Sequence, residues 1–310
     1  MSTTMSLLRG RVRLGIWPTP LQHVDGAAGV HVKREDLCGF AFGGSKIRAL
    51  EPLLDQAVSS GAERIVLGGR RDSNWMALAA VAASRLGLEC RCIVDPGPTT
   101  TLAMGIARRF GATIRIAPAP GAEAVNAAIA EVVAELGPSA FGIPRAGADA
   151  TGVLGYRALV REVLDQLTNS APVDIVVALG SGGMAAGLLL GLEEGRLDRE
   201  VAVHAVPVSK ATEQATHAVR RLLESARERD LTQADPDAAL RRLRILPRTG
   251  RSTELAELAE AQSGTLLDPV FAGPAWNAFG AQSRDAARTV VLVASGGLPA
   301  VFDSVRDGDR

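Results

Sequence analysis

Short runs of β-branched apolar residues alternate with longer runs rich in alanine and leucine along most of this chain. The short runs are typical of buried strands, and the longer runs repeat apolar residues at the spacing of one helical face. Such an alternation favours an α/β fold with parallel sheets. We expect strands over residues 30–33, 64–67, 90–94, 113–116, 174–179, 202–206 and 289–293. We expect helices over 47–59, 74–86, 101–110, 122–136, 152–168, 184–194, 212–230 and 252–261, and a linker or surface loop over 230–251.

Length and charge limit the kinds of protein this chain can be. The 310 residues, 47% of them hydrophobic, suit one large domain or two lobes with substantial cores. The formal net charge is zero and basic residues alternate with acidic ones, which is not the pattern of a nucleic-acid or membrane-surface binder. Arg9 and Arg11 break the apolar start of the chain, and no apolar run is long enough to span a membrane. We expect a cytoplasmic protein with no nucleic-acid or membrane partner.

Cysteine and histidine are too few and too scattered to predict a disulfide framework or a metal site. The three cysteines are an odd number, and Cys90 and Cys92 fall on one face of an expected strand, where core packing explains them. No second Cys or His pair lies at metal-ligand spacing. We therefore expect no metal.

Lysine is rare in this chain, since only Lys33, Lys46 and Lys210 stand among 34 basic residues. Arginine stays protonated at any working pH, whereas a lysine can lose its proton and attack a carbonyl carbon. The three lysines are either retained by chance or retained for chemistry that arginine cannot perform. Lys46 is the candidate for such chemistry because it follows the turn Gly43–Ser45, directly before an expected helix.

Two further glycine-rich turns stand where an expected strand meets an expected helix. Residues Gly180–Gly183 precede the helix from Met184, so their backbone N–H groups could converge on an anion at its N-terminus. The turn Gly68–Asn74 lies at the carboxyl end of another strand, where open parallel sheets bind ligands. Tight turns need glycine in any case, and Ser73 or Asn74 could serve only as a helix N-cap, so each turn alone is a weak indication.

The turn before Lys46 partly matches a nucleoside-triphosphate loop. Gly39 and Gly44 have the separation of that loop, but Lys46 comes one residue too late and no hydroxyl follows it to bind magnesium. The sequence therefore argues against nucleotide binding. Pyridoxal 5'-phosphate fits the turns better, because it needs an imine-forming amine, an anion cradle, a partner for its ring nitrogen and a donor near its phenolic oxygen.

Nine short segments occur in the order found in the aminocyclopropane-carboxylate deaminase and D-cysteine desulfhydrase family of fold type II, tryptophan-synthase-β-like, pyridoxal-phosphate enzymes. The chain resembles this family from about Trp17 to Phe302, through the segments Pro18–Leu21, Val32–Leu37, Gly43–Lys46, Gly68–Asn74, Ile143–Pro144, Gly152–Tyr156, Gly180–Gly183, Asp268–Val270 and Ser295–Pro299. The resemblance implies two lobes, each an open, mostly parallel sheet flanked by helices. Residues 1–48 and 151–310 would form a large cofactor-binding lobe, and residues 49–150 a small inserted one. It also implies a homodimer.

The resemblance implies a role for each candidate site residue. Lys46 would hold the cofactor as a Schiff base and move the α-proton of the substrate, while Ser73 would face the substrate carboxylate. Asn74 would bind the phenolic oxygen, and Ser295 would place a neutral hydroxyl at the ring nitrogen. That nitrogen then stays unprotonated, which favours elimination or replacement at Cβ over transamination. The phosphate would be bound by the backbone of Gly180, Ser181, Gly182, Gly183 and Met184.

The chain departs from the family at positions that bear on the reaction. Ala49 replaces a phosphate-binding lysine, so Arg48 is the candidate to supply that charge. The substrate pocket would be lined by Ser73, Asn74, Trp75 and Phe271, and Phe271 stands where the family has tyrosine. The lost hydroxyl argues against opening of a cyclopropane ring, and we expect the sole tyrosine, Tyr156, to pack inside a helix.

We therefore expect a lyase or deaminase that acts on a small amino acid by α-proton abstraction and β-elimination, as a D-cysteine desulfhydrase does. Two alternatives stay open. One is a β- or γ-replacement synthase in specialised metabolism, and the other is a catalytically altered family member that only binds its ligand.

Overall fold

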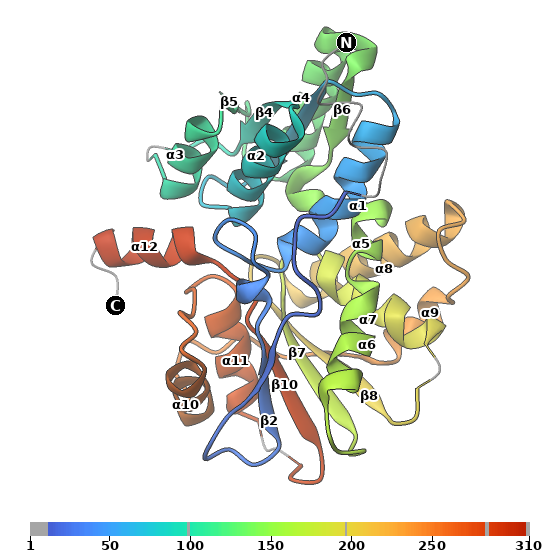
Figure 1. Ribbon diagram of the computed structural model, residues 1–310, viewed down its shortest axis with the longest axis vertical. Coiled ribbons are helices and arrows are strands. Elements are labelled where there is room, and N and C mark those ends of the chain that lie inside the picture. Colours follow the sequence, from blue (N-terminus) through green and yellow to red (C-terminus); the bar gives the residue numbers. More distant parts are fainter. Residues whose placement is uncertain (1–11, 98–99, 196, 283–284, 308–310) are drawn as a thin grey trace.

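Two separate β-sheets form the framework of the chain (Figure 1). The structure is a computed structural model that describes residues 12–97, 100–195, 197–282 and 285–307. The larger sheet has the order β1-β2-β10-β7-β8-β9, in which β1 is antiparallel to β2 and the other pairs are parallel. Its strands are β1 (Leu21–His23), β2 (Val30–Lys33), β7 (Val173–Leu179), β8 (Val201–Pro207), β9 (Leu243–Ile245) and β10 (Thr289–Val293). The smaller sheet is wholly parallel, with the order β5-β4-β3-β6, and its strands are β3 (Arg64–Gly69), β4 (Glu89–Val94), β5 (Thr113–Ile116) and β6 (Ala140–Ile143).

Helices connect the strands and flank both sheets (Figure 1). A typical one is α2 (Asn74–Leu86), which begins where the Ser73 side chain accepts a hydrogen bond from the Trp75 N–H and ends at Gly87, with φ +70°. The others are α1 (Lys46–Ser59), α3 (Leu102–Arg109), α4 (Ala122–Leu136), α5 (Ala150–Leu154), α6 (Arg157–Gln166), α7 (Gly183–Glu194), α8 (Thr212–Glu228), α9 (Pro236–Leu240), α10 (Glu254–Ser263), α11 (Ala272–Gly280) and α12 (Leu298–Asp307). None of the helices in the described ranges is long and apolar enough to cross a membrane.

The predicted α/β class is confirmed, and all seven predicted strands are present. Central strands such as β7 are buried on both faces, which is why they read as unbroken apolar runs in the sequence. Cys90 and Cys92 are buried on one face of β4 with their Sγ atoms 3.8 Å apart, as the packing interpretation predicted. Within the part of the chain that the structure describes, no cluster of three or more His, Cys, Asp or Glu residues could hold a metal.

Two predictions about secondary structure were wrong. The helix predicted over 152–168 is broken into α5 and α6 at Gly155, where a Cβ atom would lie 1.7 Å from the carbonyl oxygen of Arg48. This close approach to α1 leaves no room for a side chain. The linker predicted over 230–251 contains α9 and the short strand β9, which pairs with β8 at the edge of the large sheet.

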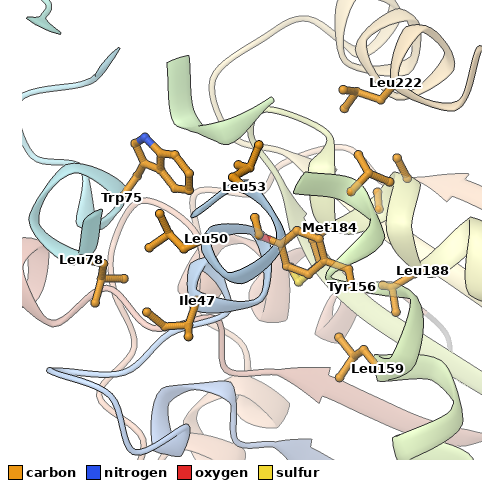
Figure 2. Close-up of a cluster of buried hydrophobic side chains, with 14 of the residues drawn as sticks. Ile47, Leu50, Leu53, Trp75, Leu78, Tyr156, Leu159, Met184, Leu188 and Leu222 are labelled. Atoms are coloured by element: carbon orange, nitrogen blue, oxygen red, sulfur yellow. The ribbon is translucent and has the colours of Figure 1, made fainter. Parts of the chain in front are cut away.

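Helix α1 joins the two halves of the molecule through a shared core. Figure 2 shows Ile47 and Leu50 of α1 between Trp75 and Leu78 of α2 on one side and Tyr156 on the other. All five side chains are fully or almost fully buried. Lys46, the first residue of α1, is therefore positioned by a helix that is packed on both sides.

Candidate active site

A cavity of about 410 Å³ lies between the two sheets, at the carboxyl ends of their parallel strands. The turn after β3 forms one wall, and the turns after β7 and β10 form the other. The structure brings the predicted catalytic, cofactor-binding and substrate-pocket residues to this one cavity. These residues are Lys46, Ser73, Asn74, Trp75, Gly180, Ser181, Gly182, Gly183, Met184, Phe271 and Ser295.

Lys46 reaches the cavity without a partner. Its side chain is partly accessible from the cavity, yet protein surrounds it, and this burial lowers the pKa of Lys46 to about 8. None of the residues that the structure describes forms an ion pair with it, so no charge offsets the effect. With a pKa of about 8, roughly a tenth of the amine is neutral near pH 7, far more than for an ordinary lysine. Lys46 is thus suited to attack a carbonyl carbon or to accept a proton.

The turn before α1 packs against the turn after β10. The backbone N–H of Ser45 donates a hydrogen bond of 3.0 Å to the carbonyl oxygen of Ser295. Gly44 has φ +121°, and a Cβ there would lie 3.0 Å from the same oxygen. This close approach requires glycine and sets the distance between Lys46 and Ser295.

The turn after β7 can bind an anion. Gly182 adopts φ +97°, which favours glycine, and leads directly into α7. The N–H groups of Ser181 and Gly182 donate to no acceptor among the described residues. Together with the free N–H groups and partial positive charge at the start of α7, they form a cradle for a phosphate.

On the opposite wall, Asn74 has an unmet hydrogen-bonding need. Its Oδ1 atom is buried and has no partner in the described ranges of the chain. A buried polar atom without a partner is costly, so a ligand that binds this amide would be favoured. Trp75 forms a fully buried wall against Gly147, where a Cβ would lie 2.5 Å from the indole.

Asp268 links Phe271 to the turn after β10. Its carboxylate is fully buried and accepts hydrogen bonds of 2.5 to 3.0 Å from the backbone N–H groups of residues 270–272. Burial raises the pKa of Asp268 to about 6, although these N–H groups act in the opposite direction. Gly297 packs against the same carboxylate, since a Cβ there would lie 2.7 Å from its Cγ. The Phe271 ring is thereby held beside Gly180, where a Cβ would be 3.4 Å away.

Arg48 does not bring charge to the cavity, contrary to the sequence-based expectation. Its guanidinium is buried, lies 2.6 Å from both Glu35 and Glu162, and stacks over Trp17 at 3.9 Å. Residues two apart on a helix face different ways, so Lys46 and Arg48 cannot both point into the cavity.

Lys33 and Tyr156 also lie outside the cavity lining. Lys33 is buried, donates a hydrogen bond of 2.7 Å to the carbonyl of Thr19, and lies 3.3 Å from Glu162. Tyr156 is 1% exposed and packs against Gly187, where a Cβ would lie 2.5 Å from the tyrosine Cβ. Tyr156 therefore has the packing role expected from the sequence.

The sequence did not predict four cations that line the cavity: Arg70, Arg145, Lys210 and Arg221. Lys210 could have been identified from the sequence, because it is one of three lysines and follows the carboxyl end of β8. Nothing distinguishes the three arginines from the many others in the chain until the fold brings them together.

A lysine without a partner, an anion cradle and a free amide around one cavity suit a class of enzymes: those that hold a small phosphorylated carbonyl compound through a lysine. Comparison with known families shows which family within this class the chain belongs to. The chain belongs to the family of pyridoxal-phosphate dependent enzymes, whose family model matches residues 12–297. Its cofactor is pyridoxal phosphate. Lys46 fits the aldehyde, the turn after β7 fits the phosphate, and Asn74 fits a polar ring substituent.

Individual relatives are similar over nearly their whole length. A putative 1-aminocyclopropane-1-carboxylate deaminase of Pyrococcus abyssi is 33% identical, covering 94% of this chain and 93% of the relative. A D-cysteine desulfhydrase of Salmonella schwarzengrund is 28% identical, covering 92% of this chain and 93% of the relative. The crystal structure of a homologue of 1-aminocyclopropane-1-carboxylate (ACC) deaminase matches with a TM-score of 0.82 and 28% identity, covering 99% of this chain and 98% of that one. The resemblance to this fold type II group is thus confirmed.

Proposed function

We propose that the chain is a lyase that removes a β-substituent from a small amino acid, as a D-cysteine desulfhydrase does. The observation that carries the proposal is Lys46, an amine of lowered pKa on the cavity wall that has no ion-pair partner among the residues described. Pyridoxal phosphate, when bound, supplies an electron-withdrawing ring that weakens the bond from the α-carbon to its hydrogen. Lys46 would hold the cofactor, then accept the α-proton while the β-substituent leaves. Hydrolysis would give a keto acid and ammonia.

The other cavity residues would orient the reacting groups. Ser73 would bind the substrate carboxylate, and the Asn74 side chain would donate a hydrogen bond from Nδ2 to the phenolic oxygen of the cofactor. The turn from Gly180 to Met184 would bind the phosphate. The Ser295 hydroxyl would face the ring nitrogen without protonating it, which favours elimination over transamination.

Two lobes would enclose the substrate. We assign residues 1–48 and 151–310 to one lobe and 49–150 to the other, a division supported by the two separate sheets. Closure of the lobes would exclude water and bring Ser73 toward Lys46.

Phe271 favours elimination over opening of a cyclopropane ring. Its ring carries no hydroxyl that could transfer a proton, and Tyr156 is buried outside the cavity. Lys46 is therefore the residue to which we assign proton transfer. Replacement at Cβ or Cγ by an added nucleophile is the second candidate, because the same residues would carry its first half.

A substrate screen tests the proposal. The purified protein would be incubated with D- and L-amino acids that carry β- or γ-leaving groups, and keto acid and ammonia would be measured with and without an added thiol or amine. We expect both products in a 1:1 ratio without the nucleophile. A product that forms only with the nucleophile would instead identify a replacement synthase, and neither reaction in any mixture would identify a protein that only binds.

We also propose that the protein acts as a homodimer in the cytoplasm. The family resemblance supports the dimer, and the three free buried cysteines suit a reducing compartment. Light scattering of the purified protein tests the dimer, since a mass near 32.3 kDa would identify a monomer.

A further inference from the structure

Lys210 and Arg221 are cations of the cavity wall that lack an acidic partner. In the part of the chain that the structure describes, neither forms an ion pair or a side-chain hydrogen bond. The two other unpredicted cations of the wall are neutralised, because Arg145 lies 2.5 Å from Asp95 and Arg70 lies 2.8 Å from Asp72.

The local field around Lys210 is positive. Burial lowers the pKa of Lys210, and repulsion from Arg221 and Arg145 lowers it further, with no carboxylate acting in the opposite direction. Such an arrangement is unfavourable in the absence of an anion and favourable in its presence.

The strand order places Lys210 on the phosphate side of the cavity. Strands β10, β7 and β8 are successive neighbours, so the residues after their carboxyl ends, Ser295, Gly180 and Lys210, follow one another across the sheet. The Val208 N–H donates a hydrogen bond of 3.2 Å to the carbonyl of Leu179, which brings the Lys210 segment beside the anion cradle.

Arg221 approaches the cradle from α8. A Cβ at Gly182 would lie 3.3 Å from the backbone nitrogen of Val219 and 3.4 Å from Leu222, so α8 packs directly on the turn. Arg221 lies on the face of α8 that lines the cavity, together with Ala218, Leu222 and Ser225.

Near α1, the cations of the described ranges are already engaged. Lys46 is committed to the aldehyde, Arg48 is held by Glu35 and Glu162, and position 49 is alanine. We propose that Lys210 and Arg221 bind the phosphate of pyridoxal phosphate together with the backbone N–H groups of the turn after β7. The inference rests on the binding of this cofactor in this cavity, which the proposed function also requires.

The test compares two cofactors that differ only in the phosphate. Dissociation constants for pyridoxal phosphate and for pyridoxal would be measured with the wild-type chain, Lys210→Gln, Arg221→Gln and the double variant, after removal of bound cofactor. Hydrogen bonds to charged groups are the strong ones, so we expect affinity for pyridoxal phosphate to fall about tenfold in each single variant and about a hundredfold in the double variant. Affinity for pyridoxal should stay unchanged, which also shows that the variants are folded.

Arg220→Gln is the matched control, because Arg220 neighbours Arg221 on α8 but is paired with Asp237 at 2.6 Å and does not line the cavity. It should bind both cofactors as the wild type does. Unchanged affinity of the double variant for pyridoxal phosphate would overturn the inference, as would equal losses for both cofactors. A rise in KM for substrates with a second acidic group, with normal cofactor affinity, would assign the pair to the substrate instead. If the wild-type chain bound neither cofactor, the proposed function itself would fail.

Discussion

The backbone N–H of Ser45 lies 3.0 Å from the carbonyl oxygen of Ser295. This hydrogen bond joins the turn that presents Lys46 to the turn that presents the Ser295 hydroxyl, so the two ends of the cofactor ring would be held at a fixed separation. Both turns depend on glycine conformations, with φ +121° at Gly44 and +85° at Gly296. The geometry of the site is thus set by backbone contacts as much as by its reactive side chains.

Gly44→Ala should weaken cofactor binding as well as stability. The new Cβ would meet the Ser295 oxygen at 3.0 Å in a backbone conformation that L-residues avoid, at a cost of about 1–3 kcal/mol. Denaturant unfolding and cofactor titration measure the two effects. Gly61→Ala is the control, because Gly61 has φ +79° but no atom within 4 Å of an added Cβ. It should lose stability without losing cofactor affinity, and equal affinity losses in both variants would contradict this account.

The pH dependence of cofactor attachment should follow Lys46. Neutral amine is the reactive form, and a pKa of about 8 makes the rate rise about tenfold between pH 7 and 9 and then level off. The growth of the visible absorbance band after pyridoxal phosphate is added to cofactor-free protein measures this rate. A rate that continues to climb tenfold per pH unit beyond pH 9 would mean that burial does not lower the pKa of Lys46.

Arg48→Ala should destabilise the fold strongly. It would leave Glu35, which is fully buried, without its partner at 2.6 Å, a loss of about 3–5 kcal/mol in the free energy of unfolding. Arg161→Ala is a suitable comparison, since Arg161 is 71% exposed and its pair with Asp165 should contribute about 0.5 kcal/mol. Similar losses in the two variants, measured by urea unfolding, would refute the structural role given to Arg48.

Tyr156→Phe should leave kcat/KM for the best substrate of the screen within about twofold of wild type, because phenylalanine keeps the ring that packs against Gly183 and Gly187. Tyr156 is buried outside the cavity lining, and burial and the nearby Glu35 raise its pKa, so its hydroxyl stays protonated. A large fall in kcat with normal cofactor affinity would assign proton transfer to this hydroxyl.

The sequence predicts this fold well where one local pattern decides the structure. Strands such as β7 and β10 are buried on both faces and read as apolar runs, and α2 carries its own N-cap and C-terminal glycine. The sequence fails where a distant contact decides. The break at Gly155 arises from close contact with the backbone of Arg48, more than a hundred residues earlier. The short strand β9 forms because it pairs with β8 at the edge of the large sheet.

The same distinction holds for the site. Lys46, Asn74 and the turn after β7 stand in recognisable local patterns, and the fold brings them to one cavity. Arg48 and Ala49 look like neighbours of the phosphate in the sequence, but helix geometry turns Arg48 toward Glu35 and Glu162. Lys210 and Arg221 belong to segments that only the strand order places beside Gly180.

We propose that Lys46 carries the cofactor, and the scarcity of lysine in the chain allows the attachment site to be identified. The protein would be loaded with pyridoxal phosphate, reduced with borohydride and digested, and the modified peptide would be identified by mass spectrometry. We predict a visible band that borohydride abolishes, a stable adduct on Lys46, and neither in Lys46→Arg. An adduct on Lys33 or Lys210, or a protein that stays colourless with added pyridoxal phosphate, would contradict the account.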